Sequence, residues 1–96
     1  MDYFFQFTPK AKKEFIDAYD FYEEQIFGLG DKFRREVYYF VSLIIKNPLS
    51  YPLKSKKLRE VVLKKFPFII IYRIEDTNST IYVSSIFHTK RNPKLK

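Results

Sequence analysis

The side chains best suited to chemistry are one histidine and a small set of cations in the second half of the chain. His88 is the single histidine, and it has the only side chain whose ordinary pKa lies near neutrality. His88 and Arg91 are the candidate catalytic pair, because acid–base chemistry at a phosphate needs a proton carrier and a cation beside the developing charge. Four further cations are predicted to contact phosphates or another anionic target: Arg59, Lys64, Lys65 and Lys90.

Each of these residues also has a purely structural interpretation. His88 ends a predicted strand, where it could only hydrogen-bond to a nearby loop. Lys64–Lys65 could simply solvate a hairpin, and Lys90–Arg91 could be a solvated chain end. Arg59 could pair with a carboxylate such as that of Glu60 or Glu75 and so fix a sheet edge. The sequence leaves both interpretations open.

The charge balance favours an anionic partner. The chain of 96 residues carries a formal net charge of +7, so RNA, DNA, the ribosome surface and an acidic protein tail all qualify. It has no cysteine and one histidine, which leaves no disulfide, thiolate site or conventional zinc site, and we expect no cofactor. No apolar run approaches the roughly 18 residues of a membrane span, and the N-terminus lacks a signal-peptide pattern. We therefore expect a cytosolic protein without a membrane partner.

The elements that must position these side chains can be read from apolar spacing. The length suits a single domain over residues 1–96. A strand is predicted at 3–7, and Thr8–Pro9 should start a helix that runs to Phe27, with Phe15, Tyr19 and Tyr22 packed in the core. Gly28 suits a left-handed cap, Asp31 should start a second helix, and Asn47–Pro48 should end it.

The remaining half of the chain is predicted to be β-structure. Strands are expected at 58–66, 68–75 and 80–88, with a turn at 76–79. Short connections should make these three strands an antiparallel meander. Tyr72 is interpreted as a core residue rather than a base-stacking platform. The order strand, helix, helix, strand, strand, strand predicts an α+β fold in which an antiparallel helix hairpin packs on one face of the sheet.

Several segments resemble the RelE/ParE family, the small basic toxins of type II toxin–antitoxin pairs. The first helix and the start of the second resemble the helix-hairpin signature of these toxins. The similarity continues through the following loop and the strands, and it runs from about Tyr3 to Pro93. The segments that carry it are 18–25, 28–33, 47–48, 51–52, Arg59, 64–68, 72–74 and 87–93.

The resemblance implies a growth-inhibiting toxin, the β-α-α-β-β-β fold, and an acidic antitoxin as partner. It leaves the target open, because some relatives cleave mRNA on the ribosome and others, of the ParE kind, poison DNA gyrase. RNA-cleaving relatives often place a basic side chain on the central strand, and segment 68–72 has none. This slightly favours gyrase poisoning. A RelE-like, metal-independent mRNA endoribonuclease is the alternative, and a nonenzymatic nucleic-acid-binding module is a more distant one.

Overall fold

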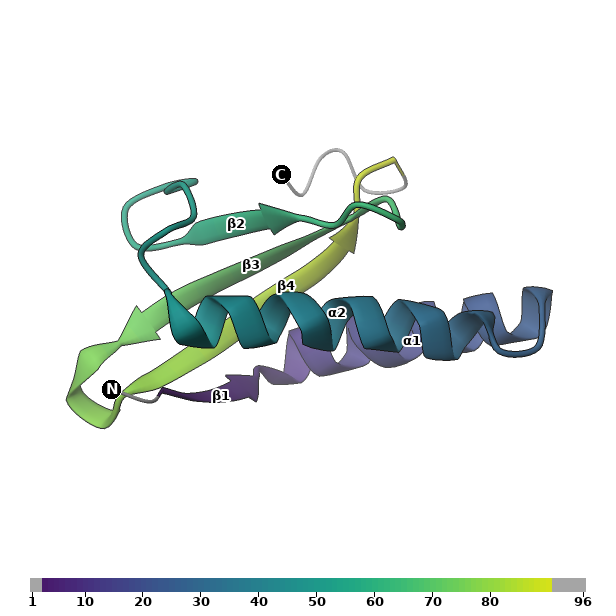
Figure 1. Ribbon diagram of the computed structural model, residues 1–96, viewed down its shortest axis with the longest axis horizontal. Coiled ribbons are helices and arrows are strands. Elements are labelled where there is room, and N and C mark those ends of the chain that lie inside the picture. Colours follow the sequence, from purple (N-terminus) through teal and green to yellow (C-terminus); the bar gives the residue numbers. More distant parts are fainter. Residues whose placement is uncertain (1–2, 91–96) are drawn as a thin grey trace.

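Two helices lie side by side over one face of a four-stranded sheet (Figure 1). The structure is a computed structural model, and it describes residues 3–90. The elements, in chain order, are β1 (Phe4–Phe7), α1 (Pro9–Gln25), α2 (Leu29–Lys46), β2 (Arg59–Val62), β3 (Phe68–Glu75), a 3-10 turn (Asp76–Asn78) and β4 (Thr80–His88). The α+β class and element order predicted from the sequence are confirmed.

The sheet is mixed, with the strand order β1-β4-β3-β2. The predicted meander is confirmed, because β2, β3 and β4 pair antiparallel in sequence order. The sequence did not specify a partner for β1, which pairs parallel to β4 at one edge. β4 is an interior strand, and its last residue, His88, pairs with Phe68, which follows the turn that joins β2 to β3.

β4 carries one extra residue relative to β3. Ile71 pairs with Ser85, whereas Tyr72 pairs with Val83, and Ser84 is therefore left between the two pairs. The Ser84 hydroxyl donates to the Ile71 carbonyl at 3.2 Å, which holds the two strands together at this bulge. A bulge of this kind bends its strand and increases the local twist.

α1 begins as the sequence predicts and ends earlier. The Thr8 side chain accepts a hydrogen bond from the Ala11 N–H at 3.2 Å, and Pro9 occupies the first helical position. The helix ends at Gln25 rather than at the predicted Phe27, because Ile26 adopts an extended conformation with φ −147°. The hairpin tip therefore consists of an extended residue followed by a tight turn.

The turn between the helices is held by one carboxylate. Glu23 accepts hydrogen bonds from the N–H groups of Gly28 and Gly30, each at 2.9 Å. Gly28 has φ +89°, which confirms the predicted left-handed position. α2 begins at Leu29 and not at the predicted Asp31, because Glu23 already supplies the acceptor expected from an Asp31 cap. Asp31 instead accepts from the Tyr19 hydroxyl at 3.1 Å.

Gly30 is where the two helices approach most closely in this turn. A Cβ at Gly30 would lie 2.8 Å from the Tyr19 carbonyl oxygen and 2.9 Å from Glu23 Oε1. Gly30→Ala should therefore lower the free energy of unfolding by about 1–3 kcal/mol, a typical cost of overpacking. Urea unfolding followed by circular dichroism measures this loss. Gly28→Asn is the control, since Asn tolerates a positive φ; equal stability of Gly30→Ala and wild type would contradict the prediction.

Stacked and edge-on aromatic rings fill the space between the helices and the sheet. Phe33 on α2 is fully buried, and its ring centroid lies 5.0 Å from that of Phe68 and 5.4 Å from that of Phe66. From α1, Phe15 and Tyr22 approach the same ring at 5.7 and 5.5 Å. The prediction that these two residues pack in the core is confirmed, since both pack against the buried cluster, whereas Tyr19, predicted with them, is not part of that cluster and donates its hydroxyl to Asp31.

β2 is shorter than predicted. The sequence indicated a strand over 58–66, whereas β2 ends at Val62 and a turn follows over 63–67. The Leu63 N–H still donates to the Phe68 carbonyl at 3.0 Å. Beyond it, the N–H groups of Lys64 and Lys65 bind the side chain of Glu36 on α2 instead of a strand. β2 thus ends where the Glu36 side chain on α2 accepts the backbone N–H groups that would otherwise continue the strand.

Candidate functional site

Four of the predicted site residues gather at one end of the sheet. Lys64 and Lys65 lie in the turn between β2 and β3, and His88 and Lys90 lie at and just after the end of β4. The turn and the segment that ends β4 are joined by a hydrogen bond, because the N–H of Thr89, between His88 and Lys90, donates to the Pro67 carbonyl at 2.9 Å. Figure 1 shows the two segments together at the same end of the sheet. We call this group the turn cluster.

The backbone of the turn cluster is held by Glu36. Its carboxylate accepts the Lys64 N–H at 2.7 Å and the Lys65 N–H at 2.9 and 3.2 Å, and the residue is 9% exposed. Within residues 3–90, neither lysine ammonium group forms an ion pair. Glu36 therefore fixes the backbone of the two lysines, while their ammonium groups stay available to a partner.

His88 has a defined orientation at the end of β4. Its ring lies edge-on to that of Phe68, with centroids 5.1 Å apart. Its Nδ1 accepts a hydrogen bond from the Lys90 N–H at 3.0 Å. The neutral ring consequently carries its proton on Nε2, because Nδ1 is the acceptor. In this tautomer Nε2–H can donate a hydrogen bond, whereas a general acid would need the imidazolium form of the ring. Arg91, its predicted catalytic partner, lies outside the described residues.

Arg59 is the predicted contact that the structure places elsewhere. It begins β2, at the end of that strand opposite the turn cluster. Its Nη1 donates to the Tyr51 carbonyl at 2.6 Å and reaches the Leu49 carbonyl at 3.5 Å. Arg59 therefore anchors the loop after α2 through carbonyl oxygens, rather than pairing with a carboxylate at the sheet edge. A direct contact between Arg59 and the target stays a prediction.

Tyr72 supports the same loop from inside. The side chain is fully buried, which confirms its predicted place in the core, and its hydroxyl donates to the Pro48 carbonyl at 2.6 Å. Burial raises the pKa of the Tyr72 hydroxyl to about 12, against a smaller opposing effect of the nearby Arg59 charge. The hydroxyl is therefore a neutral structural donor at physiological pH and has no part in acid–base chemistry.

A cleft opens between α2 and the turn cluster. Its volume is about 630 Å³, and α2 supplies two cations to it that the sequence reasoning missed. Cations on an exposed helix face look like ordinary solvated residues, and the one available signal was the three-residue spacing of Lys32 and Arg35, which places them on one face. The lining residues are Lys32, Arg35, Glu36, Tyr39, Phe40, Lys64, Lys65 and Phe66.

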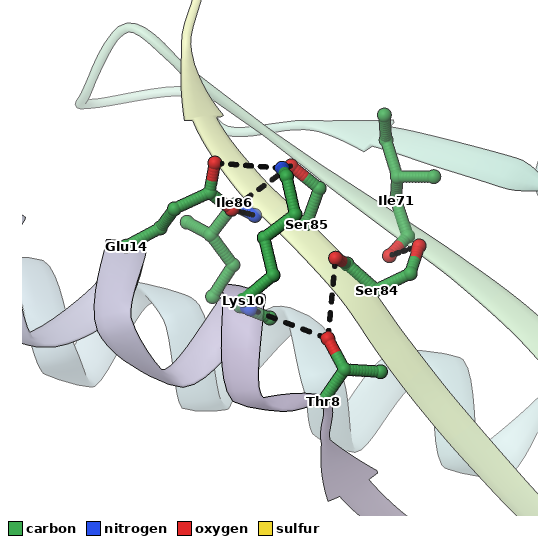
Figure 2. A network of polar contacts seen from close by, with 8 residues as sticks. Thr8, Lys10, Glu14, Ile71, Ser84, Ser85 and Ile86 are labelled. Atoms are coloured by element: carbon green, nitrogen blue, oxygen red, sulfur yellow. Dashed lines mark hydrogen bonds and ion pairs between the residues drawn. The ribbon is translucent and has the colours of Figure 1, made fainter.

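A polar network between α1 and β4 positions the end of β4. As Figure 2 shows, the Glu14 side chain reaches from α1 to the β4 backbone, where Oε1 accepts the Ile86 N–H at 2.9 Å and the Ser85 hydroxyl at 3.0 Å. Lys10 closes the network by donating to both Glu14 and Ser85, at 2.9 and 3.1 Å. Beyond the part of β4 that pairs with β1, α1 thus supplies the hydrogen-bond partners of the strand. In this way α1 fixes the strand that carries His88.

Two other kinds of site were sought in residues 3–90. These residues bring together no group of three or more His, Cys, Asp or Glu side chains that could hold a metal ion. None of the helices they form is long and apolar enough to cross a bilayer. The site that these residues do form is a cationic and aromatic surface, which is suited to binding anions.

Comparison with known proteins gives a consistent family and fold. The chain matches the family model described as the ParE toxin of the type II toxin–antitoxin system parDE over residues 5–93. No curated protein sequence matches it.

Solved structures of several toxins have a similar fold. The chromosomal ParDE toxin–antitoxin system from P. aeruginosa contains a chain with a TM-score of 0.75 and 19% identity, which covers 90% of this chain and 95% of that one. A mutant E. coli toxin RelE in the free state gives a TM-score of 0.73 at 18% identity, with coverage of 97% and 90%. The intact E. coli RelBE toxin–antitoxin complex gives 0.71 at 18%, with coverage of 93% and 99%.

Proposed function

Because the chain belongs to the ParE toxin family of type II toxin–antitoxin systems, we propose that it arrests growth by poisoning DNA gyrase and that an acidic antitoxin neutralises it. The net charge of +7 and the turn cluster supply the attraction to a nucleic-acid machine. In this proposal Lys64, Lys65 and Lys90 contact the anionic surface of the target.

The observation that favours gyrase over mRNA cleavage is the character of the sheet face that points away from the helices. Val61 of β2 and Ile70 of β3 point into the core beneath the helices. The neighbouring residues of each strand therefore point to the opposite face of the sheet. Where β2 and β3 pair, that side presents Glu60 opposite Ile71 and Val62 opposite Ile69. A carboxylate among apolar side chains cannot stabilise a developing phosphorane.

A ribosome-dependent mRNA endoribonuclease is the second candidate, and the geometry of His88 favours it. In this candidate mechanism a His88 imidazolium would protonate the leaving oxygen and become neutral, and the cations of the turn cluster would stabilise the charged phosphorane. Arg91 completes this candidate site as a proposed catalytic cation. The same residues would then act on RNA directly instead of on gyrase.

Expression of the chain alone should stop growth, and co-expression of the antitoxin should restore it. The purified toxin should inhibit DNA supercoiling by gyrase while it leaves ribosome-bound mRNA intact in primer extension. Lys64→Glu with Lys65→Glu should abolish the arrest, because charge reversal repels an anionic target. The control is Lys12→Glu with Lys54→Glu, which changes net charge equally at exposed positions away from the turn cluster.

Three outcomes would count against this proposal. Normal growth at confirmed expression would contradict the toxin function itself. Message cleavage that is lost in His88→Ala would replace gyrase with mRNA as the target. Equal arrest by both double variants would remove the turn cluster from the proposed contact surface.

A further inference from the structure

The cleft beside the turn cluster is the larger part of a two-part groove. A second hollow of about 440 Å³ shares Tyr39, Phe40 and Lys64 with it and continues along β2 as far as Val62. The first part is bordered by cations, whereas the second is mostly apolar. We propose that this α2–β2 groove binds a nucleoside polyphosphate, with its phosphates in the cationic part and its base in the apolar part. The inference goes beyond the proposed function and does not depend on it.

Four cations from two elements border the first part of the groove. α2 contributes Lys32 and Arg35, and the turn after β2 contributes Lys64 and Lys65. All four are exposed, and within residues 3–90 none of them forms an ion pair. The Glu36 carboxylate, which also lines this part, already binds the backbone N–H groups of the two turn lysines. The four charges are therefore available to a polyanion, and a chain of three phosphates carries roughly four negative charges at neutral pH.

Aromatic and aliphatic side chains line the second part of the groove. Tyr39 lies at the junction, since it borders both parts, and it is 59% exposed. The face of an exposed aromatic ring can stack on a nucleobase. The other apolar residues of this part are Phe40, Leu43, Tyr51, Pro52, Val61 and Val62. A base attached to the phosphates would thus leave water for an apolar surface directly beside the cations.

The uneven charge of the groove favours a free nucleotide over a nucleic-acid strand. A strand carries one phosphate at every nucleotide, so it needs cations along its whole path. Among the described residues that line the second part, Lys64 is the only cation, and Glu60 would repel a phosphate there. A nucleoside polyphosphate carries its charge at one end and an apolar ring at the other, which matches the two parts. Their volumes of about 630 and 440 Å³ lie in the range of roughly 300–1,000 Å³ that is usual for small-molecule sites.

The test is isothermal titration calorimetry of the full chain with ATP, and with inorganic tripolyphosphate and adenosine as the two halves of that ligand. ATP should bind about tenfold or more tightly than either half, because each half fills only one part of the groove. Equal affinity for ATP and tripolyphosphate would overturn the proposal, since a basic surface attracts any polyanion. Tighter binding of a 5′-phosphorylated (dA)3 strand, whose charge is similar, would also overturn it and would assign the groove to nucleic acid.

Variants test the two parts of the groove separately. Tyr39→Ala should weaken ATP binding about tenfold and leave tripolyphosphate binding unchanged, because it removes the ring that stacks on the base, whereas Tyr39→Phe should bind ATP like wild type. Arg35→Gln with Lys65→Gln should weaken both ligands about tenfold or more. The control, Lys12→Gln with Lys54→Gln, removes equal charge at exposed positions outside the groove and should change either affinity less than about twofold. Unchanged ATP binding by Tyr39→Ala or by the Arg35 and Lys65 double variant, with thermal unfolding showing a folded chain, would refute the proposal.

Discussion

Phe33→Ala should lower the free energy of unfolding by about 3–5 kcal/mol, the usual cost of removing a buried aromatic ring. Phe33 has no exposed surface, and its ring contacts rings from α1, from the turn after β2 and from β3. Removal of the ring would leave a cavity bounded by three separate elements, so no single side chain can move to fill it. Small domains are stable by only about 5–15 kcal/mol, and this variant should be barely folded.

Chemical denaturation followed by circular dichroism measures the effect of Phe33→Ala. The matched control is Phe27→Ala at the hairpin tip, where the side chain is 95% exposed and the same substitution should change stability by less than about 0.5 kcal/mol. Phe33→Leu keeps most of the volume and should cost less than about 1.5 kcal/mol. A loss as small in Phe33→Ala as in Phe27→Ala would show that the helices do not pack on the sheet as described.

Glu36→Ala should have the second largest effect, with a loss of about 2–4 kcal/mol. The substitution removes a charged acceptor and leaves the N–H groups of Lys64 and Lys65 without their partner, each at a cost of about 1–2 kcal/mol. Glu36→Gln keeps one oxygen, but its amide nitrogen would face a donor, so about half of the loss should remain. We also expect weaker growth arrest from Glu36→Ala, because the turn that carries both lysines is no longer held to α2.

Denaturation and amide exchange together test this role of Glu36. In Glu36→Ala the amides of Lys64 and Lys65 should exchange faster, whereas the Ile86 amide, which Glu14 protects, should not change. Glu24→Ala is the control, since that residue is exposed on α1. Unchanged exchange at both lysine amides would show that another group holds the turn.

Local sequence patterns predicted the elements that are defined by their own residues. β3 and β4 have the predicted bounds, because each is a β-rich run between clear breakers. The errors lie where a carboxylate binds backbone N–H groups distant in the sequence. Because of the Glu23 contacts, α2 starts earlier than predicted, and because of the Glu36 contacts, β2 ends earlier than predicted. The spacing of apolar residues contains no information about such contacts.

The candidate site was predicted in part. The sequence indicated the cations of the turn cluster and His88, and the structure brings them to one end of the sheet. It did not indicate that Arg59 would be used to hold a loop, since that depends on where the carbonyls of Leu49 and Tyr51 lie. Lys32 and Arg35 escaped notice because only the packing of α2 against the turn shows that they border a cleft.

The bulge at Ser84 decides on which face of the sheet the following side chains of β4 lie. Ser84 is the extra residue between the Tyr72–Val83 and Ile71–Ser85 pairs, so the in–out alternation of the strand is shifted by one step. His88 consequently falls on the same side as Phe68 and the core, while Phe87 takes the opposite side. In a strand of strict alternation these two neighbours would exchange sides. A single extra residue in β4 thus determines which face of the sheet carries the His88 side chain.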